Sequence, residues 1–413
     1  MQSSSLRLPS LMCRNLDIRK MRFSMMARKV GVVAAGHAKF GKRLDATMRE
    51  LSAEAYKPIY DAGITQDMID ATVLSYAASQ FSGQGAGSAL IADYLGLHEK
   101  PHLRVESACT TGTASLRAAW GMVSAGLYDT MLVLGVEQMN RVSSAKATEY
   151  MSQAGDMRWE YPYGISFPAF YALMASRYMA EYDLPHEVLS KISVKSHHYG
   201  AQNPYAHLPR TVTVEEAHNS VPITRPLNLY DCSLISDGAA AIVIAAEEKA
   251  KEFTDEPMWI KGIGAGASSM MIQDRESLTS IPGAKSAAKA AYDMAGVGPE
   301  DIDMAQVHDC FTIAELIAYE DLGFAEPGKG RELIENKEVY HDGSIPVNCD
   351  GGLKSKGHPL GATGVSMVYE IYSQMRGEAR EPSRQIDDVQ IGLAHNVGQS
   401  GQFVNVFILE RGW

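Results

Sequence analysis

Residues 103–112 of the chain read LRVESACTTG, a short apolar run that leads into small and polar residues. The spacing predicts a strand at 103–105 and a helix at 113–124. The same order, a buried strand and then a helix, is predicted earlier in the chain, at 30–34 and 48–62. Strands that alternate with helices indicate an α/β fold with a parallel sheet covered on both faces.

The second half of the chain repeats this alternation, so we expect two similar, doubly wound halves at 29–256 and 257–413. Residues 140–230 break the rhythm and are rich in Met and aromatic side chains. We expect them to form an inserted loop domain, which either fills the core or lines an apolar pocket. In the second half, strands are predicted at 258–262, 304–307, 389–393 and 403–409, and helices at 286–295, 313–322 and 365–375.

Composition and charge narrow the classes of function. The 413 residues carry 38 Lys and Arg against 49 Asp and Glu, and this net charge of −11 argues against nucleic-acid binding. No run of about 18 apolar residues is present, so no membrane span is expected. The five cysteines are odd in number and none has CxxC spacing, so neither a disulfide framework nor a zinc ribbon is expected.

Residues 1–28 differ from the rest of the chain. They are rich in Arg and Ser, and Asp17 is their one acid. Such a segment is either a disordered arm or a targeting peptide. We therefore expect a cytoplasmic protein, or an organellar one if the segment is a transit peptide.

A cysteine and a histidine stand in loops that suit catalysis. Cys109 is expected at a helix N-terminus, where free backbone N–H groups lower the thiol pKa and favour the thiolate. His358 lies in the glycine-rich segment 357–364 and could accept a thiol proton or donate to an oxyanion. Taken alone, Cys109 is equally well explained as a buried structural cysteine.

Two further polar segments follow predicted strands. Residues 308–311 read HDCF and come directly after the strand at 304–307, where open α/β sheets place their active sites. Residues 395–398 read HNVG and are expected to form a turn that presents backbone donors. Each alone is better explained by packing or an ordinary turn, but four such loops at strand ends suit acyl transfer through a thioester.

These motifs resemble those of the thiolase superfamily, over nearly the whole chain from about residue 30. The string VESACTTGTASLRAA around Cys109 is similar to the thiolase nucleophile loop, and NCDGGLKSKGHPLGATG around His358 to the glycine-histidine-proline loop. The HDCF sequence resembles that of the sterol-carrier-protein-type and archaeal thiolases, where other thiolases carry asparagine-glutamate-alanine-phenylalanine.

The resemblance implies a five-layered αβαβα fold with two similar halves and an inserted loop domain, assembled as a dimer or a dimer of dimers. It implies an acyltransferase of lipid metabolism that is similar to acetyl-CoA acetyltransferases. Such enzymes catalyse reversible Claisen condensation or thiolysis of 3-oxoacyl-CoA, with coenzyme A as cosubstrate and no bound cofactor or metal. By position, Cys109 would hold the acyl group, His358 would activate it, His308 would help to order an oxyanion-site water, and Cys310 would be the acid/base.

The chain departs from the common thiolases near its C-terminus. Those enzymes carry an acid/base cysteine in a Cys-x-Gly loop, whereas this chain has HNVG at that place. The acid/base therefore stays open between Cys310, which we prefer, and His395. The expected substrate and oxyanion residues are His395, Asn396, Val397 and Gly398, with backbone N–H groups near the last two joining that of Cys109.

Three alternatives remain on sequence grounds. Archaeal-type relatives often work with a small zinc-ribbon/OB-fold protein, and 140–230 shows no clear Lys/Arg cluster for the CoA 3′-phosphate. With such a partner, the substrate would be an aromatic or dicarboxylic 3-oxoacyl-CoA. A decarboxylating ketosynthase would use Cys109, His308 and His358, although Cys310 and the proline after His358 argue against it. The third alternative is a non-catalytic acyl-CoA-binding subunit.

Overall fold

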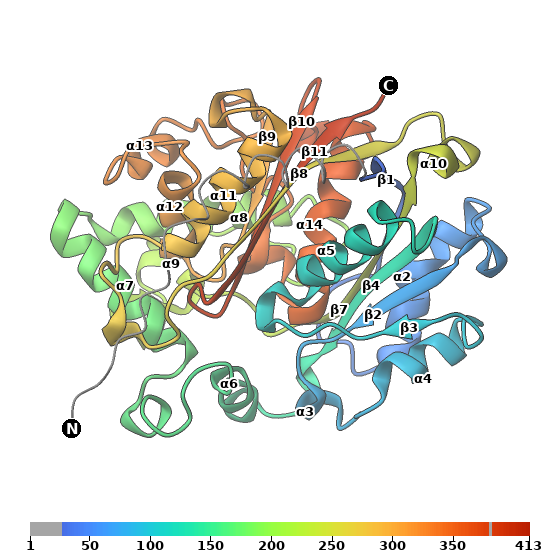
Figure 1. Ribbon diagram of the computed structural model, residues 1–413. Coiled ribbons are helices and arrows are strands. Elements are labelled where there is room, and N and C mark those ends of the chain that lie inside the picture. The colour runs from blue at the N-terminus through green and yellow to red at the C-terminus, as the bar shows by residue number, and fades with distance from the viewer. Residues whose placement is uncertain (1–26, 380–381) are drawn as a thin grey trace, which may run out of the picture.

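A computed structural model describes residues 27–379 and 382–413. Within these residues, nine strands form one sheet in the order β3-β2-β4-β7-β1-β8-β11-β10-β9. Figure 1 shows helices on both sides of this sheet, in agreement with the predicted α/β class. Searched over the same residues, no helix has the length and apolar character needed to cross a membrane. Most of the proposed arm, residues 1–26, lies outside the described part of the chain.

The two halves of the sheet have the same internal plan. In the N-terminal half, β4 pairs with β2 in parallel and with β7 antiparallel, and β7 pairs antiparallel with β1. In the C-terminal half, β10 pairs with β9 in parallel and with β11 antiparallel, and β11 pairs antiparallel with β8. Strands β1 and β8 join the halves. The strands are β1 (Val30–His37), β2 (Ala71–Ser75), β3 (His102–Leu103), β4 (Thr130–Gln138), β7 (Asp237–Ala246), β8 (Met258–Gly266), β9 (Met304–Val307), β10 (Ile391–Gly398) and β11 (Phe403–Arg411).

The expectation of a parallel sheet is therefore wrong for part of each half. Only four residues, 399–402, connect β10 to β11. A connection this short joins antiparallel neighbours, because a parallel neighbour needs a crossover of a dozen residues or more. Each parallel pair has at least one helix between its strands, such as β2 and β4 with α5 between them. A long helical connection does not by itself make a pair parallel, since β4 and β7 are separated by residues 139–236 and pair antiparallel.

Helices α5 and α14 form the central layer. They contact each other, and α5 packs on β2 and β4 while α14 packs on β4 and β7 and also on β9 and β10. Helices α2 and α4 cover the outer side of the N-terminal half, and α11 covers β8 and β11 (Figure 1). These helices are α2 (Met48–Asp61), α4 (Gly87–Tyr94), α5 (Thr111–Ser124), α11 (Pro282–Ala295) and α14 (Leu360–Met375), with the shorter α3 (Ser79–Ser82) and α10 (Glu247–Phe253).

The segment expected to be an inserted loop domain is mainly helical. Its helices α7 and α8 bury aromatic and aliphatic side chains in the main hydrophobic core, next to α12 and α13. Tyr171, Phe170 and Tyr178 are fully or almost fully buried there. The elements are α6 (Ser144–Ser152), α7 (Phe167–Tyr182), α8 (His186–Gly200), α9 (Val214–His218), β5 (Pro222–Thr224) and β6 (Leu227–Asn228), with α12 (Thr312–Asp321) and α13 (Gly330–Glu335).

Arg28, the last residue of the expected arm, is bonded to the N-terminal half of the fold. The Arg28 guanidinium donates to the carboxylate of Asp129 at 2.6 Å and to the backbone oxygens of Val123 and Tyr128. These bonds attach the start of the fold to the end of α5 and to the strand that follows it.

Candidate active site

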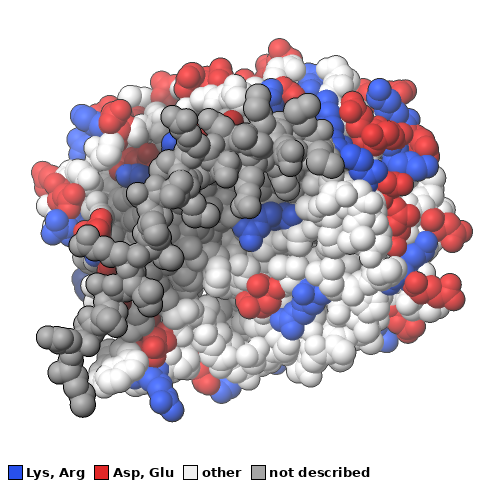
Figure 2. All heavy atoms as spheres, viewed as in Figure 1, with Lys and Arg blue, Asp and Glu red and all other residues white. Residues whose placement is uncertain are grey.

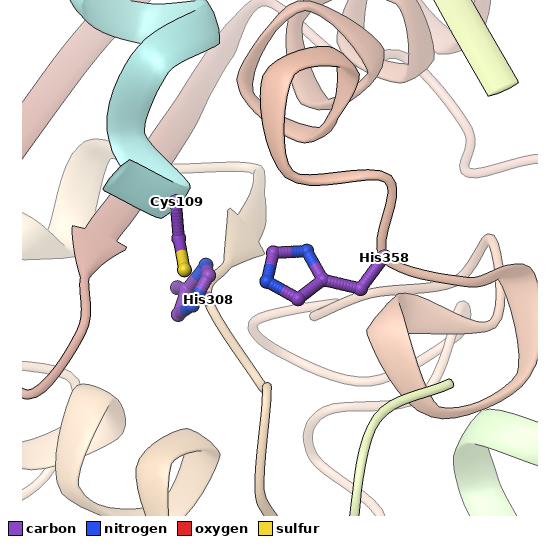
Figure 3. A group of neighbouring side chains, drawn as sticks. All are labelled: Cys109, His308 and His358. Carbon is purple, nitrogen blue, oxygen red and sulfur yellow. The ribbon is translucent and has the colours of Figure 1, made fainter. Parts of the chain in front are cut away.

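Three side chains that the sequence singled out in separate loops meet at one point. The sulfur of Cys109 and one ring nitrogen each of His308 and His358 lie within 4.8 Å of one another, and all three residues are buried. Figure 3 shows the Cys109 sulfur next to the His308 ring, with the His358 ring pointing toward both from its own loop. Cys109 belongs to a short 3₁₀ turn before α5, His308 follows β9, and His358 precedes α14.

Two glycines allow these elements to approach. A Cβ on Gly112 would lie 2.8 Å from the backbone nitrogen of Val365, and one on Gly364 would lie 2.4 Å from that of Thr113. Real Cβ atoms do not come this close to backbone, so the first turns of α5 and α14 need glycine where they touch. This contact sets Cys109 and His358 side by side, each at the start of its helix.

The backbone before the nucleophile is held in a strained conformation. Ala108 has a φ of +47°, which costs a residue with a Cβ about 1 kcal/mol or more. Side chains fix the turn: the carboxylate of Glu106 accepts the Ala108 N–H at 2.6 Å, and the Thr111 hydroxyl accepts the Ser107 N–H at 3.0 Å. The turn therefore presents the Cys109 side chain to the interior of the site.

The hydrogen bonds of His358 fix its tautomer. The Thr363 hydroxyl donates to the backbone oxygen of Pro359 at 3.0 Å, so its oxygen accepts from His358 Nδ1–H at 2.7 Å. Nε2 is then the unprotonated nitrogen, and it has no hydrogen-bond partner. Burial lowers the pKa of His358 to about 3, which keeps the ring neutral. His358 thus offers a lone pair to the cysteine beside it.

His308 adopts the opposite arrangement. The Asn396 side-chain nitrogen donates to His308 Nδ1 at 3.1 Å, and the Asn396 oxygen accepts from the Thr113 hydroxyl at 3.0 Å. The proton of the neutral ring is then on Nε2, which is buried without a partner. Burial first, then the nearby His358, lowers the pKa of His308 well below its usual value. One histidine is therefore placed to accept a proton and the other to donate a hydrogen bond.

The structure contradicts the expected low thiol pKa. Burial raises the pKa of Cys109 to about 12, and hydrogen bonds from the backbone N–H groups of Gln399 and of Cys109 itself offset only part of that rise. The position at a helix N-terminus is as predicted, but the cost of burying a charge outweighs it. The resting thiol is thus neutral, and forming the thiolate requires an adjacent base.

Cys310 lies in the same buried region. Its side chain is fully buried, and this burial raises its pKa well above the usual value. The Tyr171 hydroxyl acts in the opposite direction through a hydrogen bond, while the nearby Cys109 adds to the rise. Tyr171 also donates to the backbone oxygen of Gln399 at 2.5 Å. The second thiol is therefore close to the nucleophile and in contact with a phenol.

The segment 395–398 is not the turn that the sequence predicted. It forms the last four residues of β10, where Val397 and Gly398 pair with Val404 and Phe403 of β11. Pairing with β11 extends the strand through polar residues whose composition favours a turn, and His395 also pairs with Val307 of β9. Because strand side chains alternate, Asn396 points to the site and His395 to the other face of the sheet. The nearest backbone donor to Cys109 is one residue further on, at Gln399.

His395 provides a test of the pH dependence of stability. Burial lowers its pKa to about 3, and neither ring nitrogen has a hydrogen-bond partner. Unfolding returns the pKa to about 6.5, so the unfolded chain binds more protons and stability falls as the pH drops from 6.5 toward 3. Between pH 7.5 and 5.5, His395 should lower the stability of the natural chain by about 1.4 kcal/mol. His395→Leu should lack this contribution, so its stability should fall by about 1.4 kcal/mol less over the same pH range. Urea unfolding of both proteins at the two pH values measures this, and an unchanged pH dependence would contradict it.

A buried ion network links the two histidine loops. Lys354, in the segment before His358, binds the carboxylate of Asp309 and contacts that of Glu315 at 3.1 Å. Lys195 of α8 contacts Glu315 at 2.5 Å, and all four side chains are fully buried. Lys354 also donates to the Asp309 backbone oxygen at 3.2 Å. Because Asp309 lies between His308 and Cys310, this network sets their position relative to the His358 loop.

Removing one charge of this network should destabilise the fold strongly. Lys354→Met leaves the buried Asp309 carboxylate without its cation, and we expect a loss of about 3–5 kcal/mol. The same substitution at Lys57, whose side chain is 70% exposed in its pair with Asp61, should change stability by about 0.5 kcal/mol or less. Urea unfolding at neutral pH compares the two variants. Equal effects would show that the buried network does not hold the loops.

A pocket of about 700 Å³ leads to Cys109. It is bordered by Cys109, by Leu360 after the His358 loop, and by Tyr150, Met151 and Phe167 of the inserted segment. The inserted segment therefore both fills the core, through α7 and α8, and lines a pocket, through these few residues. Among the described residues that line the pocket, Arg104 is the one cation, and its guanidinium is already bonded to Tyr76, Ser79 and Ala77.

Two contributors to the site were not predicted from the sequence. Glu137 of β4 is buried and accepts the backbone N–H groups of Ala77 at 2.7 Å and of Gly361 at 2.9 Å. Burial raises its pKa to about 7. It connects the pocket wall to the loop that carries His358. Gln399, with φ +49°, supplies a backbone N–H to Cys109, a role that no side-chain pattern could have indicated.

Comparisons with known protein families cover both halves of the chain. The family model described as the N-terminal domain of thiolase matches residues 30–248, and the thiolase C-terminal domain-like model matches residues 264–411. The acetyl-CoA acetyltransferase of Methanothermobacter thermautotrophicus is 41% identical over 93% of this chain and 100% of its own length. The benzoylsuccinyl-CoA thiolase subunit BbsB of Thauera aromatica is 30% identical, over 90% of this chain and 95% of its own.

A solved structure has the same fold. The Ltp2–ChsH2(DUF35) aldolase superposes with a TM-score of 0.81 at 25% identity, over 94% of this chain and 99% of the other. The sequence resemblance is thereby confirmed, as is the thiolase-like fold of two similar halves with an inserted segment. From its two matching domains and its full-length relatives, the chain belongs to the thiolase family.

Proposed function

We propose that this protein is a thiolase of the acetyl-CoA acetyltransferase type, which transfers acyl groups through a thioester on Cys109. The observation that carries the proposal is the hydrogen-bond pattern of the two histidines, which gives His358 a free lone pair and His308 a free N–H. One ring nitrogen of each histidine lies within 4.8 Å of the Cys109 sulfur. A neutral buried thiol needs a base such as the His358 lone pair, and a developing oxyanion needs a donor such as the His308 N–H. The 41% identity to an archaeal acetyl-CoA acetyltransferase supports the same activity.

In the first half-reaction, His358 Nε2 takes the thiol proton and the Cys109 sulfur attacks the acyl-CoA carbonyl. The backbone N–H groups of Gln399 and Cys109 lie next to the sulfur and are placed to stabilise the charge on the thioester oxygen. CoA takes the proton that His358 holds and leaves as its thiol. The acyl group then occupies the pocket bordered by the inserted segment.

In the second half-reaction, Cys310 moves the proton at the α-carbon. For condensation, the Cys310 thiol first releases its proton to solvent, and the thiolate removes a proton from the α-carbon of the second acyl-CoA. The carbanion attacks the Cys109 thioester, and the Cys109 thiolate that is released takes up a proton from solvent. For thiolysis, the Cys109 thiolate attacks the 3-oxo carbon, and the Cys310 thiol protonates the departing carbanion. His308 Nε2–H donates to the oxygen of the second thioester. His395 is on the other face of β10, so we assign the acid/base role to Cys310.

An assay of both directions tests the proposal. Purified protein is expected to condense acetyl-CoA and to cleave acetoacetyl-CoA in the presence of CoA. His358→Gln, which keeps a polar side chain but removes the base, should lower both rates about 10²–10⁴-fold. A protein that decarboxylates malonyl thioesters and leaves 3-oxoacyl-CoA intact would instead be a ketosynthase. Absence of all these reactions would point to a non-catalytic acyl-CoA-binding subunit.

A second candidate is the thiolysis of an aromatic or dicarboxylic 3-oxoacyl-CoA together with a small zinc-ribbon/OB-fold partner. Two relatives favour it, because one is a benzoylsuccinyl-CoA thiolase subunit and the other, the Ltp2–ChsH2(DUF35) aldolase, carries a second component in its name. The pocket supports it as well, since the Arg104 guanidinium is occupied by bonds within the chain. Activity toward acetoacetyl-CoA by the isolated chain would make a partner dispensable.

The remaining assignments extend this proposal. We infer that 29–256 and 257–413 are the two thiolase halves, with 140–230 inserted in the first. Assembly as a homodimer or a dimer of dimers and a cytoplasmic location agree with the family, and CoA is the cosubstrate. On the face seen in Figure 2, outside the atoms drawn in grey, acidic and basic side chains are interspersed around a largely uncharged area. Such a surface offers no extended basic patch for a nucleic acid.

A further inference from the structure

The catalytic centre also carries the ligand set of a soft divalent cation. Across residues 27–379 and 382–413, one group of His, Cys, Asp or Glu meets the geometry for three metal ligands, and it is Cys109, His308 and His358. All three are buried, and the Nε2 atoms of both rings have no hydrogen-bond partner. Figure 3 shows the sulfur and the two rings converging on a common space.

We propose that Cys109, His308 and His358 bind one Zn²⁺ ion, and that the bound ion blocks acylation of the nucleophile. Thiolate sulfur and neutral imidazole nitrogen are both zinc ligands, and three protein ligands leave the fourth position to water. Zn–S and Zn–N bonds of about 2.3 and 2.0–2.1 Å separate tetrahedral ligands by about 3.3–3.6 Å. The three atoms lie within 4.8 Å, so shifts of about 1 Å complete the site. The thiol proton passes to solvent when the thiolate binds.

The groups that hydrogen-bond to Nδ1 of His358 and of His308 decide how well Nε2 of each ring can bind a metal ion. Thr363 already holds His358 with Nδ1–H bonded and the Nε2 lone pair free, which is the arrangement of a metal-ligating histidine. His308 needs its proton moved to Nδ1, with an acceptor facing that nitrogen. Turning the Asn396 amide over supplies one, because its oxygen then faces His308 and its nitrogen faces Thr113. The Thr113 hydroxyl can accept that N–H while it donates to the Thr110 backbone oxygen at 3.1 Å.

Asn396 therefore separates the two uses of the site. When the Asn396 nitrogen faces His308, the His308 ring is a hydrogen-bond donor at Nε2, as acyl transfer requires. When the Asn396 oxygen faces His308, the Nε2 lone pair is free and His308 can bind a metal ion. Asn396→Asp offers only acceptor atoms, so it fixes the second state. We expect this variant to bind Zn²⁺ about 10–100-fold more tightly than the natural chain and to turn over acyl-CoA more slowly. A residue that merely supports the fold would not change the two properties in opposite directions.

Metal binding is tested without any assay of activity. The full-length, reduced protein is titrated with Co²⁺ alone, and the thiolate-to-cobalt charge-transfer absorption is followed in the near ultraviolet. We expect one Co²⁺ per chain, with competition by Zn²⁺. Cys109→Ser should abolish the charge-transfer band, and His358→Ala should weaken Co²⁺ binding at least about tenfold. Cys232→Ser is the matched control, because that thiol is partly exposed and bonds only the backbone of Asn228, so the band and the activity should persist.

The outcomes separate this inference from the proposed function. A wild-type protein that gives no charge-transfer band, or a band that survives in a Cys109→Ser variant with native circular dichroism, would overturn the metal site. Weaker Zn²⁺ binding by Asn396→Asp would also overturn it. The blocking effect rests on the proposed function: acetyl-CoA that loads Cys109, as seen by intact mass, should prevent the band, and Zn²⁺ added first should prevent loading. A band without any acyl loading would leave the metal site standing and refute the thiolase proposal instead.

Discussion

Cys109→Ala is expected to lower the rates of both condensation and thiolysis by at least about 10⁴-fold. The reason is that, in the proposed mechanism, the Cys109 sulfur forms the covalent bond on which both directions depend. Cys310 is nearby but is fully buried against Tyr171, with its pKa raised well above the usual value. Steady-state rates with acetyl-CoA and with acetoacetyl-CoA plus CoA give the measurement.

The control for this loss is a thiol outside the site. Cys232→Ala removes a sulfur whose recorded hydrogen bond is to the Asn228 backbone, and it should leave both rates unchanged. A Cys109→Ala protein that keeps its native unfolding transition and more than a few per cent of the activity would refute covalent catalysis at Cys109.

Cys310→Ala is expected to separate the two half-reactions. The variant should still exchange acyl groups between acyl-CoA and free CoA, because that step uses only Cys109, His358 and the oxyanion donors. Carbon–carbon bond formation and cleavage should fall about 10²–10⁴-fold, because no other group is placed to move the α-proton. Exchange of labelled CoA measures the first step, and acetoacetyl-CoA thiolysis measures the second.

Cys349→Ala is the matched variant, since that thiol is also buried and its pKa is also raised by burial. It should affect neither step. If Cys310→Ala retained full thiolysis, the acid/base would have to be sought elsewhere, and His395→Leu would be the next variant to assay. Loss of acyl exchange in Cys310→Ala would instead indicate that the substitution disturbs Cys109.

The sequence was informative about which loops meet in the structure. Cys109, His308, Cys310 and His358 each follow or precede a predicted element, and the structure brings all four into one buried region. This was predictable because strand ends and helix N-termini are defined by short local patterns. The α/β class followed from the same alternation, whereas the antiparallel strands were missed because strand direction depends on how the connections run.

The interactions that decide the protonation states were not predictable. The bonds from Thr363 to His358 and from Asn396 to His308 depend on side-chain placement to within a few tenths of an ångström. The helix N-terminus at Cys109 indicated a lowered thiol pKa, but the depth of burial raised it. Residues 395–398 were expected to form a turn because of their composition, yet pairing with β11, and with β9 at His395, makes them a strand. In each case, contacts made by distant segments outweigh the local pattern.

The most direct test of the central claim is the intact mass of the protein after mixing with a panel of acyl-CoA and 3-oxoacyl-CoA esters. We expect the mass to increase by one acyl group, the increase to be absent in Cys109→Ala and present in Cys310→Ala, and free CoA to remove it. The acyl groups that load would define the substrate class. An adduct that persists in Cys109→Ala, or no adduct with any ester in the natural chain either alone or with co-purified partners, would contradict acyl transfer through Cys109.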